Sequence, residues 1–180
     1  KLPEVKKKFE ELYENSKKSN IIKEGINISI IGRPNVGKSS LLNKLIGEDK
    51  AIVTDIEGTT RDIVEGKINI DGITLNLIDT AGIRKTSNKV EKIGVEKTYK
   101  TLEDSSLVLL VLSNDNIINQ EEKQILEKKD KNIIIVINKM DLPNKMKYDF
   151  SNKDVVRISI KDNLGINELL DKIKDKFNIR

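Results

Sequence analysis

The sequence contains no cysteine and no histidine among its 180 residues. Without cysteine there is no disulfide, no thiolate zinc site and no cysteine nucleophile. Without histidine there is no imidazole base and no Ser-His-Asp triad. No apolar run approaches the length needed to cross a bilayer and no signal peptide is visible, so we expect a cytosolic protein.

A strong excess of one charge is also missing. The chain has 33 basic and 29 acidic residues, which leaves a formal net charge of +4. A mild excess favours a solvated lysine-rich surface over a basic patch for RNA. The hydrophobic content of 37% supports a core, and the length fits one α/β domain.

One stretch organises the rest of the chain. Residues 32–39 read Gly-Arg-Pro-Asn-Val-Gly-Lys-Ser and fit the phosphate-loop pattern G-x-x-x-x-G-K-[ST]. An apolar run at 26–31 predicts a buried strand before the motif, and residues 40–46 predict an amphipathic helix after it. The glycines allow backbone N–H groups to surround an anion, and the helix adds its positive end. We predict that Lys38 reaches the β- and γ-phosphates and that Ser39 binds Mg²⁺. A chance glycine-rich turn is the alternative, and the strand–loop–helix context argues against it.

Two polar segments downstream contain candidate ligands for Mg²⁺ and the γ-phosphate. The loop at 51–62 joins a helix to a strand, and its Thr59 and Thr60 are candidate ligands for Mg²⁺ and the γ-phosphate. The runs 63–70 and 73–78 flank Asp71-Gly72, which predicts a β-hairpin. Its second strand ends at 79–82, Asp-Thr-Ala-Gly, where Asp79 is placed to hold Mg²⁺ through water and Gly82 to bring an N–H group to the γ-phosphate.

A fourth motif selects the base. Residues 138–141, Asn-Lys-Met-Asp, follow the apolar run 132–137. The Asp141 carboxylate can accept hydrogen bonds from both N1–H and the exocyclic amino group of guanine, and adenine lacks that donor pair. Asn138 can hold the loop and the base, and the stem of Lys139 can lie over the ring. We therefore predict a guanine nucleotide.

The order of elements predicts an α/β fold. Further strands are expected at 105–112 and 155–160, and helices at 3 to about 19, at 119–129, at 166–177 and near Val90. Alternating strands and helices give a mostly parallel six-stranded sheet covered by helices on both faces, with one antiparallel edge strand from the hairpin. All the motifs then lie at the ends of strands, where ligands bind in open α/β sheets.

With these motifs the sequence resembles the translation-factor-related P-loop GTPases, which have the Ras-like fold. Ser159-Ile160-Lys161 matches their Ser-Ala-Lys motif except at Ile160. A closer resemblance is to the MnmE (TrmE) family of bacterial tRNA-modification GTPases. It rests on Asn35 in the phosphate loop, on 51–62 and 78–84, and on Val90-Glu91 and 93–96.

The resemblance implies a full set of site residues. Those around the nucleotide are Asn35, Val36, Gly37, Lys38, Ser39, Ser40, Thr54, Asp55, Ile56, Glu57, Gly58, Thr59, Thr60, Asp79, Thr80, Ala81, Gly82, Asn138, Lys139, Met140, Asp141, Ser159, Ile160 and Lys161. Ser39 and Thr60 match the Mg²⁺ ligands, with Asp79 acting through water. The catalytic set is Glu91, Lys38 and Thr60, and Glu91 matches a glutamate that positions the attacking water through a second water.

The resemblance also implies a potassium ion. Ras-type GTPases orient water with a glutamine where this chain has Ile83, so another group must stabilise the charge that develops during hydrolysis. In the family K⁺ takes this role, held by oxygens that match Asn35, Thr54, Ile56 and Thr59 when two G domains dimerise. Arg61 and Arg84 are alternative charge donors, or they hold the loops through salt bridges.

Residues 1–25 are expected to be an amphipathic helix and linker, the remnant of a helical domain, and residues 26–180 the GTP-binding G domain of a longer protein. The implied function is K⁺-stimulated GTP hydrolysis through nucleotide-dependent G-domain dimerisation. It would serve tRNA wobble-uridine modification with the flavoprotein MnmG (GidA). Two alternatives stay open: a ribosome-assembly GTPase of the Der type, and a nucleotide-dependent interaction module with negligible hydrolysis.

Overall fold

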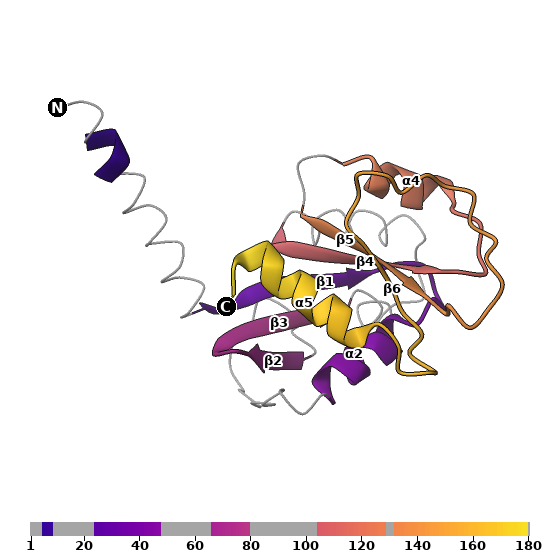
Figure 1. The fold of residues 1–180 in the computed structure, drawn as a ribbon, viewed down its shortest axis with the longest axis horizontal. Coiled ribbons are helices and arrows are strands. Elements are labelled where there is room, and N and C mark those ends of the chain that lie inside the picture. The colour runs from indigo at the N-terminus through magenta and orange to yellow at the C-terminus, as the bar shows by residue number, and fades with distance from the viewer. Residues whose placement is uncertain (1–4, 9–23, 48–65, 80–103, 129–131, 180) are drawn as a thin grey trace, which may run out of the picture.

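A six-stranded sheet forms the centre of the computed structural model, which describes residues 5–8, 24–47, 66–79, 104–128 and 132–179. The strand order across the sheet is β2-β3-β1-β4-β5-β6. The strands are β1 (Ile26–Ile31), β2 (Gly66–Ile70), β3 (Ile73–Asp79), β4 (Leu107–Ser113), β5 (Ile133–Asn138) and β6 (Val155–Arg157). The helices are α2 (Lys38–Ile46), α4 (Gln120–Leu126) and α5 (Ile166–Phe177) (Figure 1).

Only β2 runs against its neighbour. It pairs antiparallel with β3, while β1, β3, β4, β5 and β6 form parallel pairs. The hairpin turns at Asp71 and Gly72, whose φ angles are 51° and 86°. Two consecutive positive φ angles match the twist of the flanking strands, which is why Asp-Gly is favoured there. The predicted mostly parallel sheet with one antiparallel edge strand is therefore confirmed.

Each face of the sheet has its own core because successive side chains on a strand point to opposite faces. In β4, Leu107, Leu109 and Val111 belong to the core shared with α2 and α5. Val108, Leu110 and Leu112 belong to the core on the other face, which contains Leu126 of α4. Tyr148 and Phe150 pack against that second core, with ring centroids 4.9 Å apart. Helices thus cover both faces, as predicted.

Some element boundaries differ from those expected. The last strand is β6, Val155–Arg157, and Ser159 instead forms an isolated bridge with Leu164. Helix α2 begins at Lys38 and not at Ser40, and α4 covers 120–126 of the expected 119–129. Residues 5–8 are helical, and the rest of the expected 3–19 helix and the segment at 83–98 lie outside the described residues.

Within the described ranges, the helices are all too short or too polar to cross a membrane.

Candidate nucleotide-binding site

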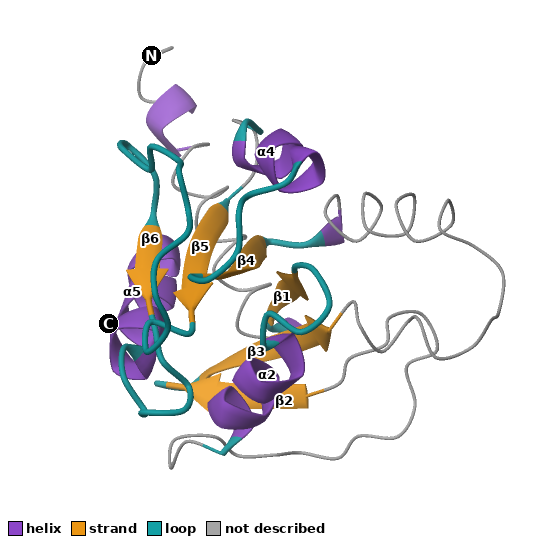
Figure 2. Ribbon diagram, turned by 90° about the vertical axis from the view of Figure 1, so that its right-hand side faces the viewer, coloured by secondary structure: helices purple, strands orange, loops and turns teal. Residues whose placement is uncertain are grey.

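The predicted site loops that the structure describes lie at one end of the sheet, where the parallel strands finish. The carboxyl ends of parallel strands lie at the same end of the sheet, so the loops that follow β1, β4, β5 and β6 lie in one region. Register places Ile30 beside Asp79 and Ser113 beside Asn138. Figure 2 shows the loop between β1 and α2 curving from the strand end back to the start of the helix.

The phosphate loop depends on two glycines. Gly32 has φ of 155° and Gly37 has φ of 104°. Gly32 lies against β4, and Gly37 lies against the end of β5. A Cβ atom at Gly32 would lie 2.3 Å from the carbonyl oxygen of Val111, and one at Gly37 would lie 2.3 Å from Nδ2 of Asn138. Since real Cβ atoms do not approach so closely, both positions require glycine.

Lys38 begins helix α2, and its side chain folds back over the loop. The residue is 7% exposed, and its Nζ donates a 2.6 Å hydrogen bond to the carbonyl oxygen of Arg33. Ser39 follows on the first turn and is exposed. Asn35 is also exposed and has φ of 64°, a conformation that asparagine adopts more readily than most residues. Lysine, hydroxyl and amide groups are therefore presented by one short segment.

Asn138 joins three loops of the site. Its Nδ2 donates a 2.9 Å hydrogen bond to the carbonyl oxygen of Val36 in the phosphate loop. Its Oδ1 accepts a longer one, 3.4 Å, from the backbone N–H of Ile160. The residue is 4% exposed, so these contacts are shielded from water. The side chain thus fixes the loop after β5 relative to those after β1 and β6.

Asp141 and the loop after β6 form a second cluster. The Asp141 side chain is 18% exposed, its Oδ1 lies 3.1 Å from the Ser159 hydroxyl and its Oδ2 lies 3.7 Å from Nζ of Lys161. The backbone N–H of Met140 donates to Ile158, which ties the same two loops together. Lys139, with φ of 62°, lies within the first of these loops, directly after β5. The arrangement holds the Asp141 carboxylate against the loop after β6.

Asn114 supports this cluster, although no sequence motif pointed to it. Its N–H donates to the carbonyl of Asn138 at 2.8 Å, and its side-chain amide donates to Leu142 at 2.7 Å. Next to it, the Ser113 hydroxyl donates to Asp115 at 2.5 Å, which lowers the pKa of that carboxyl, with further lowering by Lys139 and Lys145. The sequence signal that could have pointed to Asn114 is its position, because it is a polar residue directly after the buried strand β4.

An ion pair between a half-buried arginine and a buried glutamate connects the phosphate loop to α4. Nε of Arg33 lies 2.9 Å from Oε1 of Glu122, and the Glu122 side chain is 4% exposed. Arg33 also donates to the carbonyl oxygen of Ile117 at 2.9 Å. Asn119 and Glu122 form a capping box, a pattern of Asn-x-x-Glu that is readable in the sequence. The pairing of Glu122 with Arg33, 89 residues away, is not readable there.

Several predicted site residues lie outside the described part of the chain. They are Thr54, Asp55, Ile56, Glu57, Gly58, Thr59, Thr60, Arg61, Thr80, Ala81, Gly82, Ile83, Arg84 and Glu91. For Asp79 the structure gives the backbone, as the last residue of β3. Among the described residues no cluster of three or more acidic groups could hold a metal.

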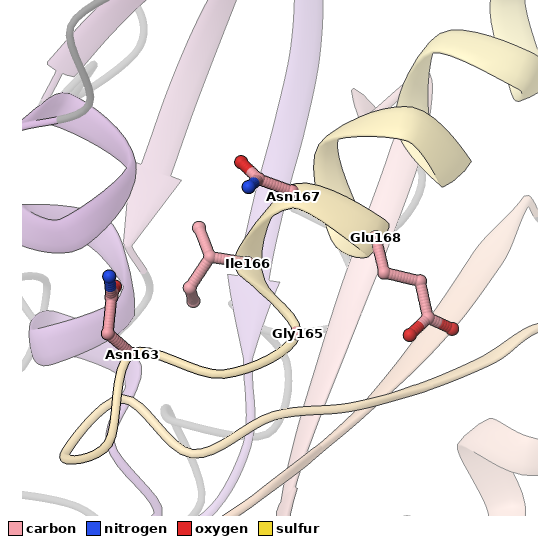
Figure 3. Close-up of a pocket in the computed structure, with 5 residues that line it drawn as sticks. All are labelled: Asn163, Gly165, Ile166, Asn167 and Glu168. Atoms are coloured by element: carbon pink, nitrogen blue, oxygen red, sulfur yellow. The ribbon is translucent and has the colours of Figure 1, made fainter.

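A hollow of about 310 Å³ lies at the start of α5. It is lined by residues of the turn that leads into the helix, Asn163, Gly165, Ile166, Asn167 and Glu168. In Figure 3 Glu168 points away from Ile166 and Asn167. None of the predicted nucleotide-binding residues lines it, although Asn163 belongs to the loop after β6 and its N–H donates to the carbonyl oxygen of Ile160.

The fold and these loops define a P-loop GTPase domain. The profile of the 50S ribosome-binding GTPase family matches residues 27–139, and the chain belongs to this family of GTP hydrolases. The fold agrees with solved relatives. The G domain of the Thermotoga maritima FeoB iron transporter is 28% identical, with a TM-score of 0.57, over 84% of this chain and 98% of that one. Aquifex aeolicus Era bound to GDP and AlF4⁻ is 24% identical with a TM-score of 0.58, over 84% of this chain and 56% of that one. At this identity the comparison establishes only that the two chains share a fold.

More similar in sequence are tRNA modification GTPases named MnmE. The Streptococcus sanguinis protein is 50% identical over 174 residues, 94% of this chain and 38% of that protein. The Streptococcus pneumoniae D39 protein is 50% identical over 167 residues, 92% of this chain and 36% of that protein. The chain thus spans under two fifths of the length of these relatives.

Proposed function

We propose that this chain is the GTP-binding and GTP-hydrolysing domain of a tRNA wobble-uridine modification GTPase of the MnmE type. The observation that carries the nucleotide part is Asn138, whose buried amide contacts the phosphate loop and the loop after β6 together. A phosphate-binding loop and a carboxylate-bearing loop are thereby held next to each other. The 50% identity over 94% of the chain to the streptococcal proteins supports the tRNA-modification part.

In this proposal different residues bind the phosphates and the guanine base. The backbone of 35–40 and the Lys38 ammonium receive the β- and γ-phosphates at the start of α2, where the helix dipole favours negative charge. Asp141 accepts from the two guanine donors, and Lys139 and 159–161 line the base. The hydroxyl of Ser159, which is fully buried, lies between two carboxylates, 3.1 Å from Asp141 and 2.9 Å from Asp162.

The residues present fit Mg²⁺ and K⁺ by the chemistry of their donors. The exposed Ser39 hydroxyl lies beside Lys38 on the first turn of α2, and Mg²⁺ prefers oxygen ligands next to phosphates. Thr60 and, through water, Asp79 would complete that set. Asn35 offers an exposed amide oxygen on the same loop, and Thr54, Ile56 and Thr59 would add oxygens for K⁺. Bound there, a cation would supply positive charge where Ile83 stands in place of the usual glutamine, and Glu91 would position the attacking water through a second water.

We further propose that the protein is cytoplasmic. Two G domains would dimerise across their nucleotide-binding faces when nucleotide is bound. In the whole protein, GTP hydrolysis would drive domain motion in a tRNA-modifying complex with the flavoprotein MnmG. A ribosome-assembly GTPase of the Der type remains the second candidate, because the family profile is named for ribosome-binding GTPases.

The test is steady-state GTP hydrolysis in KCl and in NaCl at equal ionic strength, with ATP as the control substrate. The sharpest variant is Asn35→Gly, since glycine removes the amide and still accepts a φ of 64°. A rate that rises only in K⁺, and loses this rise in Asn35→Gly, supports the proposal. Equal rates of GTP hydrolysis in both salts contradict the potassium step, and equal use of ATP contradicts the guanine assignment.

A further inference from the structure

The ion pair between Arg33 and Glu122 is built differently from the other ion pairs of the described residues. Its carboxylate side chain is 4% exposed, whereas the carboxylate partners of Lys161, Lys172, Lys174 and Lys176 are 18% exposed or more. A buried carboxylate is costly unless its oxygens are matched by donors. Here they are matched: Oε1 accepts from Nε of Arg33 and Oε2 accepts from the backbone N–H of Asn119, each at 2.9 Å.

Arg33 is held at both ends. Its guanidinium donates to Glu122 and to the carbonyl oxygen of Ile117, both at 2.9 Å. Its own carbonyl oxygen accepts from Nζ of Lys38 at 2.6 Å. A continuous set of contacts therefore runs from the start of α4 through Arg33 to the lysine of the phosphate loop.

We propose that Glu122 is a positioning residue that acts through Arg33 to hold the phosphate loop ready for the diphosphate of a guanine nucleotide. The inference rests on the proposed nucleotide site and adds a residue that touches no ligand. Its physical reason is preorganisation: a loop already fixed in its bound form loses less freedom when the anion arrives. Since Nζ of Lys38 donates to the carbonyl oxygen of Arg33, a displacement of Arg33 also displaces the Lys38 ammonium group.

Glu122 has a second role as the N3 residue of the α4 capping box, and the test must separate the two. Glu122→Gln keeps the size of the side chain and a capping-box residue type. Glutamine, however, offers one acceptor oxygen and one NH₂ group. If the oxygen serves Asn119, the NH₂ group meets Nε–H of Arg33, donor against donor. Asn119→Ala does the opposite, because it weakens the cap and leaves both Glu122 oxygens in place.

The experiment measures the affinity of the 180-residue chain for a fluorescent GDP analogue, together with the unfolding midpoint of each variant without nucleotide. The variants are Glu122→Gln, Arg33→Met, their double mutant and Asn119→Ala, with Glu121→Gln as the matched control. Glu121 lies on the same first turn of α4 and is exposed. Hydrogen exchange of the amides at 122–126 with and without GDP reports the same coupling from the α4 side, because linkage between two sites is reciprocal.

We expect Glu122→Gln and Arg33→Met each to weaken GDP binding about tenfold, the scale of a lost hydrogen bond to a charged group. The double mutant should lose no more than either single variant, since the two residues act as one unit. Asn119→Ala should lower the unfolding midpoint and keep the GDP affinity. GDP should protect the 122–126 amides in the wild type and fail to do so in Arg33→Met.

Unchanged GDP affinity in both single variants would overturn the inference while leaving the proposed function intact. So would an equal loss of affinity in Asn119→Ala, because the effect would then follow helix stability alone. A wild-type chain that binds no GDP contradicts the proposed function and removes this inference with it, and that result is read before any variant is made.

Discussion

The side-chain amide of Asn138 donates a 2.9 Å hydrogen bond to the backbone carbonyl of Val36, across a separation of 102 residues. The contact is buried and joins the loop after β5 to the phosphate loop. Its other end accepts from the N–H of Ile160. One side chain thus couples the loops that we assign to phosphate and to guanine.

Replacing Asn138 with alanine should therefore damage both affinity and stability. The change leaves the Val36 carbonyl without this donor in a buried setting, which costs about 1–3 kcal/mol. We expect GDP affinity to fall at least about tenfold, because the two loops lose their shared anchor. Calorimetric titration with GDP and urea unfolding measure the two effects. Asn167→Ala on the exposed side of α5 is the control, and equal behaviour of the two variants would contradict the role given to Asn138.

Asp141→Asn should change the base that is bound. Guanine offers two donors to the carboxylate, and an amide in its place matches only one of them. Xanthine carries a carbonyl where guanine carries its amino group, so the substituted amide can pair with it. We expect GDP affinity to fall by at least about a hundredfold and XDP to bind better than GDP, as for sites built around a buried polar pair. Competition between the two nucleotides measures this, and a variant that still prefers GDP would remove Asp141 from the guanine site.

Gly37→Ala should abolish nucleotide binding, although the change adds one methyl group. The new Cβ would lie 2.3 Å from Nδ2 of Asn138, and alanine would have to adopt a φ of 104°. Gly72→Ala is the matched control: its φ is 86°, and nothing lies within 4 Å of its added Cβ. Both variants suffer the backbone strain of about 1–2 kcal/mol, and only the first displaces a site residue. Equal GDP affinities of the two variants would show that the contact with Asn138 is unimportant.

Much of this site could be predicted from local pattern. The 32–39 motif, the Asp71-Gly72 hairpin and the apolar runs of β1, β4 and β5 are each decided within a short stretch of chain, by glycine conformation or by strand burial. The resulting fold was confirmed. Contacts such as Arg33 with Glu122 depend on how distant loops meet, and no spacing in the sequence encodes that meeting. The end of β6 was missed because Ser159 turns back to pair with Leu164, although Ile158 remains apolar and fully buried.

The pH dependence of stability should include a term from Asp154. Lys176 hydrogen-bonds to this carboxylate and, with Lys172 3.2 Å away, lowers its pKa below 3.8. A lowered pKa stabilises the fold above pH 3.8, and this contribution is lost as the pH falls through the folded-state value. Because the pair is partly exposed, Asp154→Asn should cost less than about 1 kcal/mol at pH 7, and less still in high salt. Urea unfolding at pH 7 and pH 3 tests the sign: a difference between the proteins that grows toward pH 3 would contradict it.

Ile160 is the one departure from the Ser-Ala-Lys motif that the sequence resembles, and its replacement should show whether the side chain serves core packing or nucleotide binding. The side chain packs against the core under α2 and α5, and its backbone N–H meets Oδ1 of Asn138. Ile160→Ala keeps that N–H and removes part of a half-buried side chain. We expect a loss of about 1–2 kcal/mol in unfolding free energy, at or below the lower end for buried isoleucine, with GDP affinity changed less than about threefold. Ile158→Ala, from a fully buried neighbour, is the comparison and should cost more stability. If Ile160→Ala instead weakened GDP binding strongly while the fold kept its stability, the isoleucine side chain itself would have to contact the nucleotide.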